Sequence, residues 1–235
     1  MPFTRSLGTY RAFSRWLPSQ CAICHAWPSQ RVCTACLARC APAVARCTRC
    51  AARVPDGVRH CGQCLREASG LDLCIAAVDY GWPWAELVAQ LKFHGNPGLA
   101  PALAAITGRA TGARELLRAC DALVPIPLAL QRLRERGYNQ SLLLARQLAD
   151  DKTHHAWLER AHETTAQSRL GRQGRLHNLQ GAFTVPAAAR TALRGRHVLL
   201  VDDVMTTGAT LRAAAHALRL AGAGKVSALV FARTP

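Results

Sequence analysis

The chain has 235 residues, 50% of them apolar, and 30 lysines and arginines against 14 acidic residues give a formal net charge of +16. This length allows one large domain or two smaller ones with a buried core, and no apolar run reaches the roughly 18 residues that span a membrane. The basic start, MPFTRSLGTYRAFSRWLPSQ, lacks the apolar segment of a secretory signal, so we expect a cytoplasmic protein. The charge favours nucleic acid, phosphorylated ligands or a membrane surface, although solvated arginine-rich faces explain it as well.

The first part of the chain is rich in cysteine. A Cys-x-x-Cys turn points two sulfurs at one metal, and two such turns close a tetrahedral Zn²⁺ site. Eight residues separate the first two turns and ten separate the second two. Pairing in sequence order predicts two structural zinc ions, held by Cys21, Cys24, Cys33 and Cys36 and by Cys47, Cys50, Cys61 and Cys64. Crossed pairing, disulfides and Cys40, His25 or His60 as substitute ligands remain alternatives.

Composition changes near residues 67–70, where the cysteine-rich part ends. We therefore predict a double zinc-ribbon module with a basic N-terminal extension over 1–68 and a second domain over 69–235. The second domain alternates between strand-like and helix-like segments, which predicts an α/β fold with a parallel sheet. In chain order we expect a strand at 73–81, a helix from 84, helices broken at glycines over 100–119, a strand at 121–128, a helix at 139–151, a strand at 197–203, a helix at 208–222 and a strand at 225–233.

The stretch VLLVDDVMTTGAT, residues 198–210, ends an apolar strand on two carboxylates. Ionised carboxylates are not left buried without partners, so we expect solvent, a cation or hydroxyl groups at this end. The small-residue loop that follows lets a ligand approach the backbone at Gly208, and its N–H groups and hydroxyls suit a phosphate. A ribose 5-phosphate matches both features, because its hydroxyls suit the carboxylates and its phosphate suits the loop. The alternative is a solvated turn between strand and helix, capped by a threonine.

This stretch resembles the signature for phosphoribosyl pyrophosphate (PRPP) in type I phosphoribosyltransferases. Three further stretches resemble the ComF family, as does a front end with paired Cys-x-x-Cys turns: LKFHG (91–95), VPIPLALQRLRERGYNQ (124–140) and QSRLGRQGRLHNLQGAF (167–183). The resemblance extends from about residue 21 to residue 234. It implies a phosphoribosyltransferase-like domain after a zinc module, and an association with natural competence, incoming single-stranded DNA and the use of external DNA.

The resemblance also implies roles for individual residues. Asp202 and Asp203 would accept hydrogen bonds from the ribose hydroxyls, with Mg²⁺ nearby. The 5-phosphate would be held by Thr206, Thr207, Gly208, Ala209 and Thr210. Pyrophosphate would meet Arg132, Arg134, Arg136 and Lys92, although an ordinary basic helix face and a surface lysine are the alternatives. A mobile loop, or else a basic connector, would carry Ser168, Arg169, Arg172 and Arg175.

Three functions are compatible with the sequence. One is Mg²⁺-dependent phosphoribosyl transfer from PRPP to a nitrogen nucleophile. Another is a non-enzymatic sensor of PRPP or a nucleotide, or a single-stranded DNA binder that stacks bases on Trp16, Trp27, Trp82 and Trp84. The third is an adaptor whose zinc module docks a protein such as a competence helicase. The acceptor and the oligomeric state, a homo-oligomer included, stay open.

Overall fold

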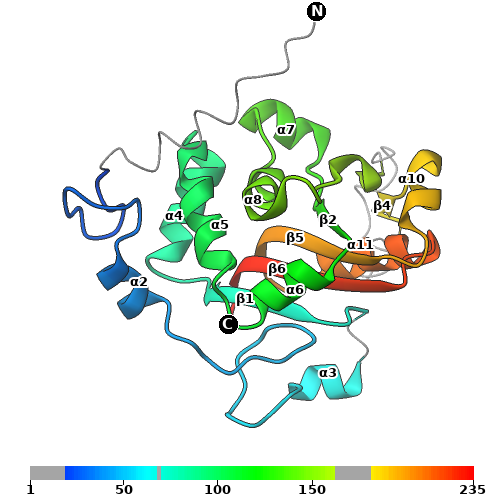
Figure 1. Ribbon diagram of the computed structural model, residues 1–235, viewed down its shortest axis with the longest axis horizontal. Helices are drawn as coiled ribbons and strands as arrows, with labels where there is room; N and C mark the ends of the chain where they lie inside the picture. The colour runs from blue at the N-terminus through cyan, green and yellow to red at the C-terminus, as the bar shows by residue number, and fades with distance from the viewer. Residues whose placement is uncertain (1–18, 68–69, 162–180) are drawn as a thin grey trace, which may run out of the picture. The chain divides into compact units, whose positions relative to one another are not determined.

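The computed structural model of the chain describes residues 19–67, 70–161 and 181–235. These residues belong to two compact units that divide after Pro42. The smaller unit contains helix α2 (Thr34–Cys40), and the other elements among the described residues belong to the larger unit (Figure 1). No helix in the described ranges is long and apolar enough to cross a membrane.

The elements of the larger unit follow the predicted alternation closely. Strand β1 and helix α4 form where the sequence predicts them, and glycines separate α5 from α6 as expected. The elements are α3 (Gly62–Arg66), β1 (Cys74–Asp79), α4 (Trp84–Phe93), η1 (Pro97–Leu99), α5 (Ala100–Thr107), α6 (Ala113–Ala119), β2 (Ala122–Pro125), α7 (Leu130–Arg136), α8 (Gln140–Ala149), η2 (His155–Trp157), β3 (Glu159–Arg160), β4 (Phe183–Thr184), α10 (Ala187–Leu193), β5 (His197–Met205), α11 (Ala209–Leu220) and β6 (Lys225–Arg233).

Four parallel strands form the central sheet in the order β1-β6-β5-β2, which confirms the predicted α/β class (Figure 1). Strand β5 lies inside the sheet, between β6 and β2, and its residues 198–201 are buried. This position explains its uninterrupted apolar run, because a strand covered on both faces buries both of its alternating sets of side chains. A separate two-stranded antiparallel sheet joins β3 to β4.

Helices cover both faces of the central sheet. On one face, side chains of β5 and β6 share a buried cluster with α10 and α11, including Leu211 and Leu218 of α11. On the other face, Phe231 of β6 meets Trp84 of α4 edge to face, with ring centroids 5.8 Å apart. Helices α5 and α8 pack against each other and against the sheet. The carboxyl ends of β5 and β2 therefore stand between helical layers, where this class of fold places ligands.

The second group of cysteines packs with the sheet. Cys47, Cys50 and Cys64 are buried in the same apolar cluster as β5, β6 and α11. For this reason the division by packing falls at residue 42, earlier than the change in composition near residue 68. The division into 1–68 and 69–235, as modules of function, stays a prediction.

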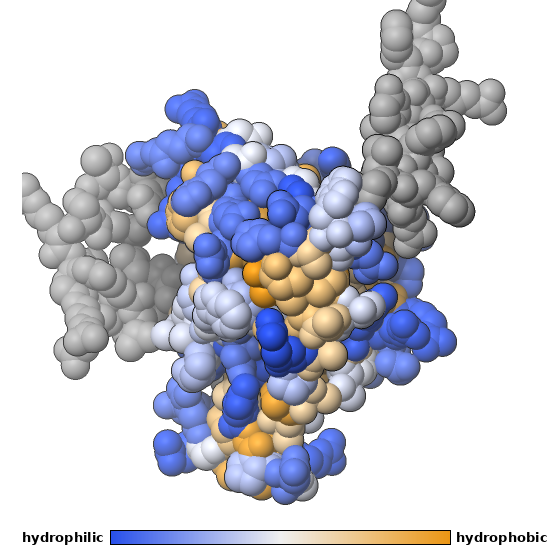
Figure 2. Space-filling model, turned by 90° about the vertical axis from the view of Figure 1, so that its left-hand side faces the viewer, coloured by the Kyte–Doolittle hydropathy of each residue, from blue (hydrophilic) through white to orange (hydrophobic). Residues whose placement is uncertain are grey.

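Strand β5 is longer than the sequence predicts. The predicted strand ends on Asp202 and Asp203, whereas β5 continues to Met205 and pairs Asp202 with Val230 of β6. The two carboxylates therefore belong to the strand itself. On the surface, the face drawn in Figure 2 is largely hydrophilic, with apolar residues gathered in patches.

Candidate functional site

Two acidic side chains leave β5 near its carboxyl end. Because side chains alternate along a strand, Asp202 and Asp203 point to opposite faces of the sheet. The side chain of Asp203 is almost fully enclosed, with 2% of the residue exposed, and that of Asp202 is half-buried. Carboxylates in such places require polar partners, and both have them.

Asp203 is held by a cation and an amide. The ammonium of Lys92, near the end of α4, lies 2.6 Å from its Oδ2, and Nε2 of Gln140 donates to its Oδ1 at 3.4 Å. The sequence-based expectation of a cation beside the aspartate pair is thus met by a residue of the chain. Lys92 was predicted to contact a phosphate, and its ion pair brings it to the same place as the carboxylates.

Asp202 is held by a hydroxyl and a backbone amide. Ser141 Oγ donates to its Oδ1 at 2.8 Å, and the N–H of Asp203 donates to the same oxygen at 2.9 Å. Burial and the neighbouring charge of Asp203 nevertheless raise the pKa of Asp202 from the ordinary value of 3.8 to about 7. This carboxyl group is therefore poised to bind or release a proton near neutral pH.

The raised pKa of Asp202 predicts a pH-dependent cost to stability. Since the folded protein holds this proton more tightly than the unfolded chain, stability falls as pH rises from about 4 to about 7 and the loss then levels off. We expect Asp202→Asn to raise the melting temperature by on the order of 5 °C at pH 8, with a smaller gain at pH 5. Thermal unfolding across this range measures the effect. Asp151→Asn, at an exposed position, is the control, and a gain independent of pH would contradict the argument.

The predicted phosphate loop joins β5 to α11. Thr206 and Thr207 are exposed, and Ala209 and Thr210 form the first turn of α11. Gly208 has a φ of 76°, and a Cβ added to it would lie 2.3 Å from the methyl carbon of Met205. The left-handed conformation therefore favours glycine here, and the flexible end of the Met205 side chain would have to move to admit a Cβ. The loop presents hydroxyls and the amides that begin a helix, which suits an anion; of these amides, that of Ala209 donates to Oγ1 of Thr207 at 3.3 Å.

The start of α8 contributes the residues that sequence reasoning missed. The side chain of Asn139 caps α8 by accepting from the amides of Ser141 and Leu142 at 2.9 and 3.3 Å, and its Nδ2 donates to Ile126 at the end of β2. The next two residues, Gln140 and Ser141, are buried and bind the aspartates. One sequence feature could have identified them: two polar residues begin a mostly apolar helix directly after a capping asparagine.

The three predicted arginines of α7 differ in position. Arg132 and Arg134 are exposed and form no ion pair with a described residue. Arg136 donates to Oε1 of Gln140, and its guanidinium carbon lies 5.4 Å from the ring centroid of Phe93. Arg136 is thus linked through Gln140 to Asp203. The predicted mobile-loop residues Ser168, Arg169, Arg172 and Arg175 lie outside the described residues.

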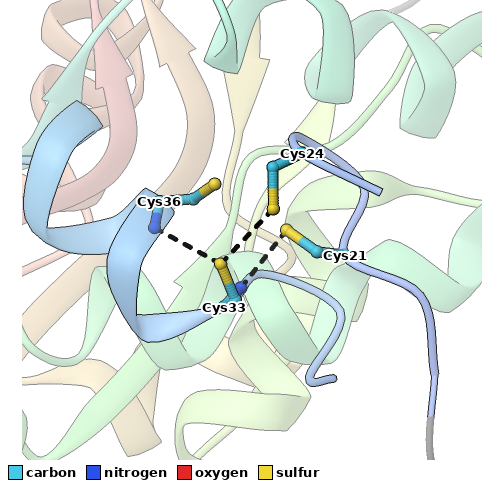
Figure 3. Close-up of side chains that lie close together, drawn as sticks. All are labelled: Cys21, Cys24, Cys33 and Cys36. Atoms are coloured by element: carbon cyan, nitrogen blue, oxygen red, sulfur yellow. Dashed lines mark hydrogen bonds between the residues drawn. The ribbon is translucent and has the colours of Figure 1, made fainter. Parts of the chain in front are cut away.

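The first cysteine cluster brings four sulfurs together (Figure 3). The thiol groups of Cys21, Cys24, Cys33 and Cys36 all lie within 4.8 Å of one another. The sulfurs of Cys24 and Cys33 are 3.7 Å apart, and the amide of Cys33 donates to the sulfur of Cys21. Burial raises the pKa of Cys21, but amide donors from Cys24 and Cys33 outweigh it and lower the value to about 6. A thiolate is the form that binds metal.

The second cluster has the same donor set. The sulfurs of Cys47, Cys50, Cys61 and Cys64 also lie within 4.8 Å of one another, and this grouping confirms the predicted pairing in sequence order. No disulfide joins any of the eleven cysteines, all of which lie in the described ranges. Four thiols gathered in this way fit Zn²⁺ in a closed, structural site, so two sites can hold zinc.

The strand, the acidic pair and the loop before α11 define a class of protein. The phosphoribosyl transferase domain family matches residues 110–235, the part of the chain that carries all three. The class is thus a phosphoribosyltransferase-type α/β domain, combined with an N-terminal region that has two four-cysteine clusters.

Similar proteins narrow the class to a family. The chain is 33% identical over 171 residues to the DNA utilization protein YhgH of Escherichia coli (strain K12), covering 68% of this chain and 71% of that protein. It is 30% identical over 175 residues to Competence protein F of Haemophilus influenzae, covering 72% and 76%. It is 37% identical over 113 residues to Competence protein ComFC of Bacillus subtilis, covering 48% and 44%. The chain belongs to the ComF family of competence and DNA utilization proteins.

Proposed function

We propose that the protein binds PRPP at the carboxyl end of β5 and transfers its phosphoribosyl group to a nitrogen nucleophile. The observation that carries the proposal is the ion pair of Asp203 with Lys92, next to Asp202 on the strand that leads into the glycine-containing loop. Carboxylates suit ribose hydroxyls, and a loop of helix-starting amides suits a 5-phosphate. One continuous segment, 202–210, therefore offers both kinds of contact.

The charged residues of the site have different roles in ligand binding. Asp202 is the carboxylate that accepts from the ribose hydroxyls, because it is half-buried and Asp203 is already engaged by Lys92. Asp203 positions Lys92, whose ammonium is partly exposed and draws phosphate oxygens toward the site. Arg136, held by Gln140 and Phe93, adds a second cation on the same side.

The reaction breaks the bond between C1 of ribose and the pyrophosphate oxygen, and it forms a bond from C1 to nitrogen. Negative charge grows on the departing pyrophosphate, so Lys92 and Arg136 would lower the barrier by neutralising it. The carboxylate oxygens of the site are the ligand type that Mg²⁺ prefers, and such an ion would supply further neutralisation of the pyrophosphate. The nitrogen loses a proton as its bond to C1 forms, and the departing pyrophosphate or solvent accepts it, so no strong base is needed.

Binding of PRPP with Mg²⁺, measured by calorimetry, tests the first half of the proposal. We expect wild type to bind and Asp202→Asn to bind at least about tenfold more weakly, since one charged hydrogen bond to ribose is lost. Asp151→Asn, at an exposed position, should bind like wild type. Absence of binding to wild type would overturn the proposal.

Release of pyrophosphate with a panel of nucleobases tests the second half. Release that requires both PRPP and one base identifies a transferase and its acceptor. Binding without release with any nitrogen nucleophile would leave a PRPP sensor instead.

We further propose that this activity serves the handling of incoming DNA, as the names of the relatives suggest. The net charge of +16 supports contact with a polyanion. Of the tryptophans considered for base stacking, Trp27 and Trp82 are exposed, Trp84 is buried against Phe231, and Trp16 lies outside the described residues. Stacking on Trp84 is therefore excluded, which leaves a smaller aromatic surface than predicted.

A further inference from the structure

A pocket opens between the second cysteine cluster and the predicted phosphate loop. It lies within the larger unit and is partly open to solvent. Three arginines from three different parts of the chain line it: Arg49 from the cysteine-rich segment, Arg212 from α11 and Arg233 from the end of β6. Gln63 and Thr207 add polar side chains.

Backbone carbonyls hold the three guanidinium groups in place. Arg49 donates to the carbonyl of Cys64 at 3.0 Å, and Arg233 donates to that of Cys50 at 3.0 Å. Arg212 donates to the carbonyl of Thr207 at 2.9 Å. A guanidinium has five N–H donors, so these bonds fix the orientation of each side chain and leave donors for a ligand.

The pocket has more positive than negative side-chain charge. None of the three arginines forms an ion pair within the described parts of the chain, and Glu67 is the acidic side chain at its wall. Like charges gathered in one place repel one another unless an anion neutralises them. Arginine is also the side chain best matched to phosphate, through paired charged hydrogen bonds.

We propose that this pocket binds the phosphate group of a second ligand, next to but separate from the loop at 206–210. The proposal rests on the pocket residues alone and does not require phosphoribosyl transfer. The pocket shares Thr207 with the predicted phosphate loop, and its other lining residues lie outside 206–210. A role limited to neutralising a metal–thiolate centre at Cys50 and Cys64 is the competing explanation for the arginines.

Titration of the full chain with inorganic phosphate, followed through the arginine Nε–H signals in NMR spectra, tests the proposal. Signals of Arg49, Arg212 and Arg233 should shift together and saturate. Gln63 lies in the pocket and is exposed, and no hydrogen bond of its side chain is recorded within the described ranges, so its charge can be varied with little disturbance. We expect Gln63→Glu to weaken binding at these arginines about tenfold or more and Gln63→Lys to strengthen it.

Controls separate this result from a change in overall charge, loss of zinc or loss of stability. Arg59→Gln removes one positive charge from an exposed position on the same cysteine-rich segment, outside the pocket, and should leave the affinity unchanged. Zinc content and melting temperature should match wild type in every variant. An equal loss in both Gln63 variants, or no saturation at the three arginines, would overturn the proposal and leave the arginines as neutralisers of the metal centre.

Two sources of phosphate are distinguished by a second titration with thymidine 5′-monophosphate. Binding at the same arginines at least tenfold tighter than inorganic phosphate identifies a nucleotide as the ligand. Equal affinities identify a free phosphate anion. If the Asp202→Asn variant loses PRPP binding but keeps these arginine shifts, the pocket and the proposed transferase site are independent, and each can fail without the other.

Discussion

Replacing Cys61 by serine is expected to lower the melting temperature of the main unfolding transition by about 10 °C or more, whereas Cys33→Ser should change it little. Both residues precede a short helix, α3 or α2, at the N-cap position, and both are half-buried. Serine is a good N-cap residue, so each substitution removes a metal ligand and keeps the helix start. Each variant should lose one of two zinc ions, which is checked by measuring the zinc content per chain with elemental mass spectrometry.

The different outcomes follow from where the two clusters pack. The second cluster shares its buried surroundings with β5, β6 and α11. It is also tied to β1 by a bond from the amide of Cys74 to the carbonyl of Thr48 at 2.8 Å, and by the ion pair of Arg46 with Asp79. The first cluster belongs to the separate smaller unit. Structural zinc contributes several kcal/mol to the fold that it closes, and about 1 kcal/mol shifts the melting temperature of a domain of this size by about 2–4 °C.

A direct comparison makes this prediction easy to reject. If Cys33→Ser lowers the main transition as far as Cys61→Ser, the two clusters support the sheet equally and the packing argument is wrong. If neither variant loses zinc, the clusters are not metal sites.

Replacing Lys92 by methionine is expected to destabilise the protein by about 3–5 kcal/mol, because it strands the buried carboxylate of Asp203 without its cation. Methionine keeps most of the aliphatic length of lysine, so packing changes little. Chemical denaturation measures the loss. The exposed Lys225, changed to methionine, is the control for loss of a lysine and should be near neutral.

A second substitution tests whether the ion pair is the cause. In the Lys92→Met background, Asp203→Asn should recover most of the lost stability, since an amide can keep the bond with Gln140 and carries no charge. The double variant should still bind PRPP weakly, because the proposed phosphate contact of Lys92 is gone. If the loss of stability in the double variant equals the sum of the losses in the two single variants, Lys92 and Asp203 do not act on each other.

Much of the fold could be predicted from the sequence. Strands such as β6 and helices such as α4 have apolar patterns that end at clear boundaries, and both form over the predicted residues. The end of β5 could not be predicted this way, because Asp202 and Asp203 read as the end of a buried strand. Pairing with β6 and polar contacts from α4 and α8 keep the strand regular as far as Met205.

The candidate site also contains residues that could be predicted from the sequence and residues that could not. Asp202, Asp203 and Gly208 stand out in the sequence because their chemistry is local to one segment. Gln140 and Ser141 do not, because their importance depends on α8 crossing β5 with some 60 residues of chain between them. The sequence left Lys92 as either a phosphate contact or a surface lysine; the structure places it in an ion pair with Asp203, and the phosphate contact stays a proposal.

The alternation of strands and helices, the four Cys-x-x-Cys turns and the acidic segment before a small-residue loop can all be predicted from the sequence, since each is a pattern of neighbouring residues. The three-dimensional fold was needed to show which cysteines share a cluster, that the second cluster packs into the core of the sheet, and which side chains contact the aspartates. These relations join residues far apart in the chain, and they are set by burial: the sheet covers the second cluster and brings Lys92, Gln140 and Ser141 to charges that could not otherwise be buried.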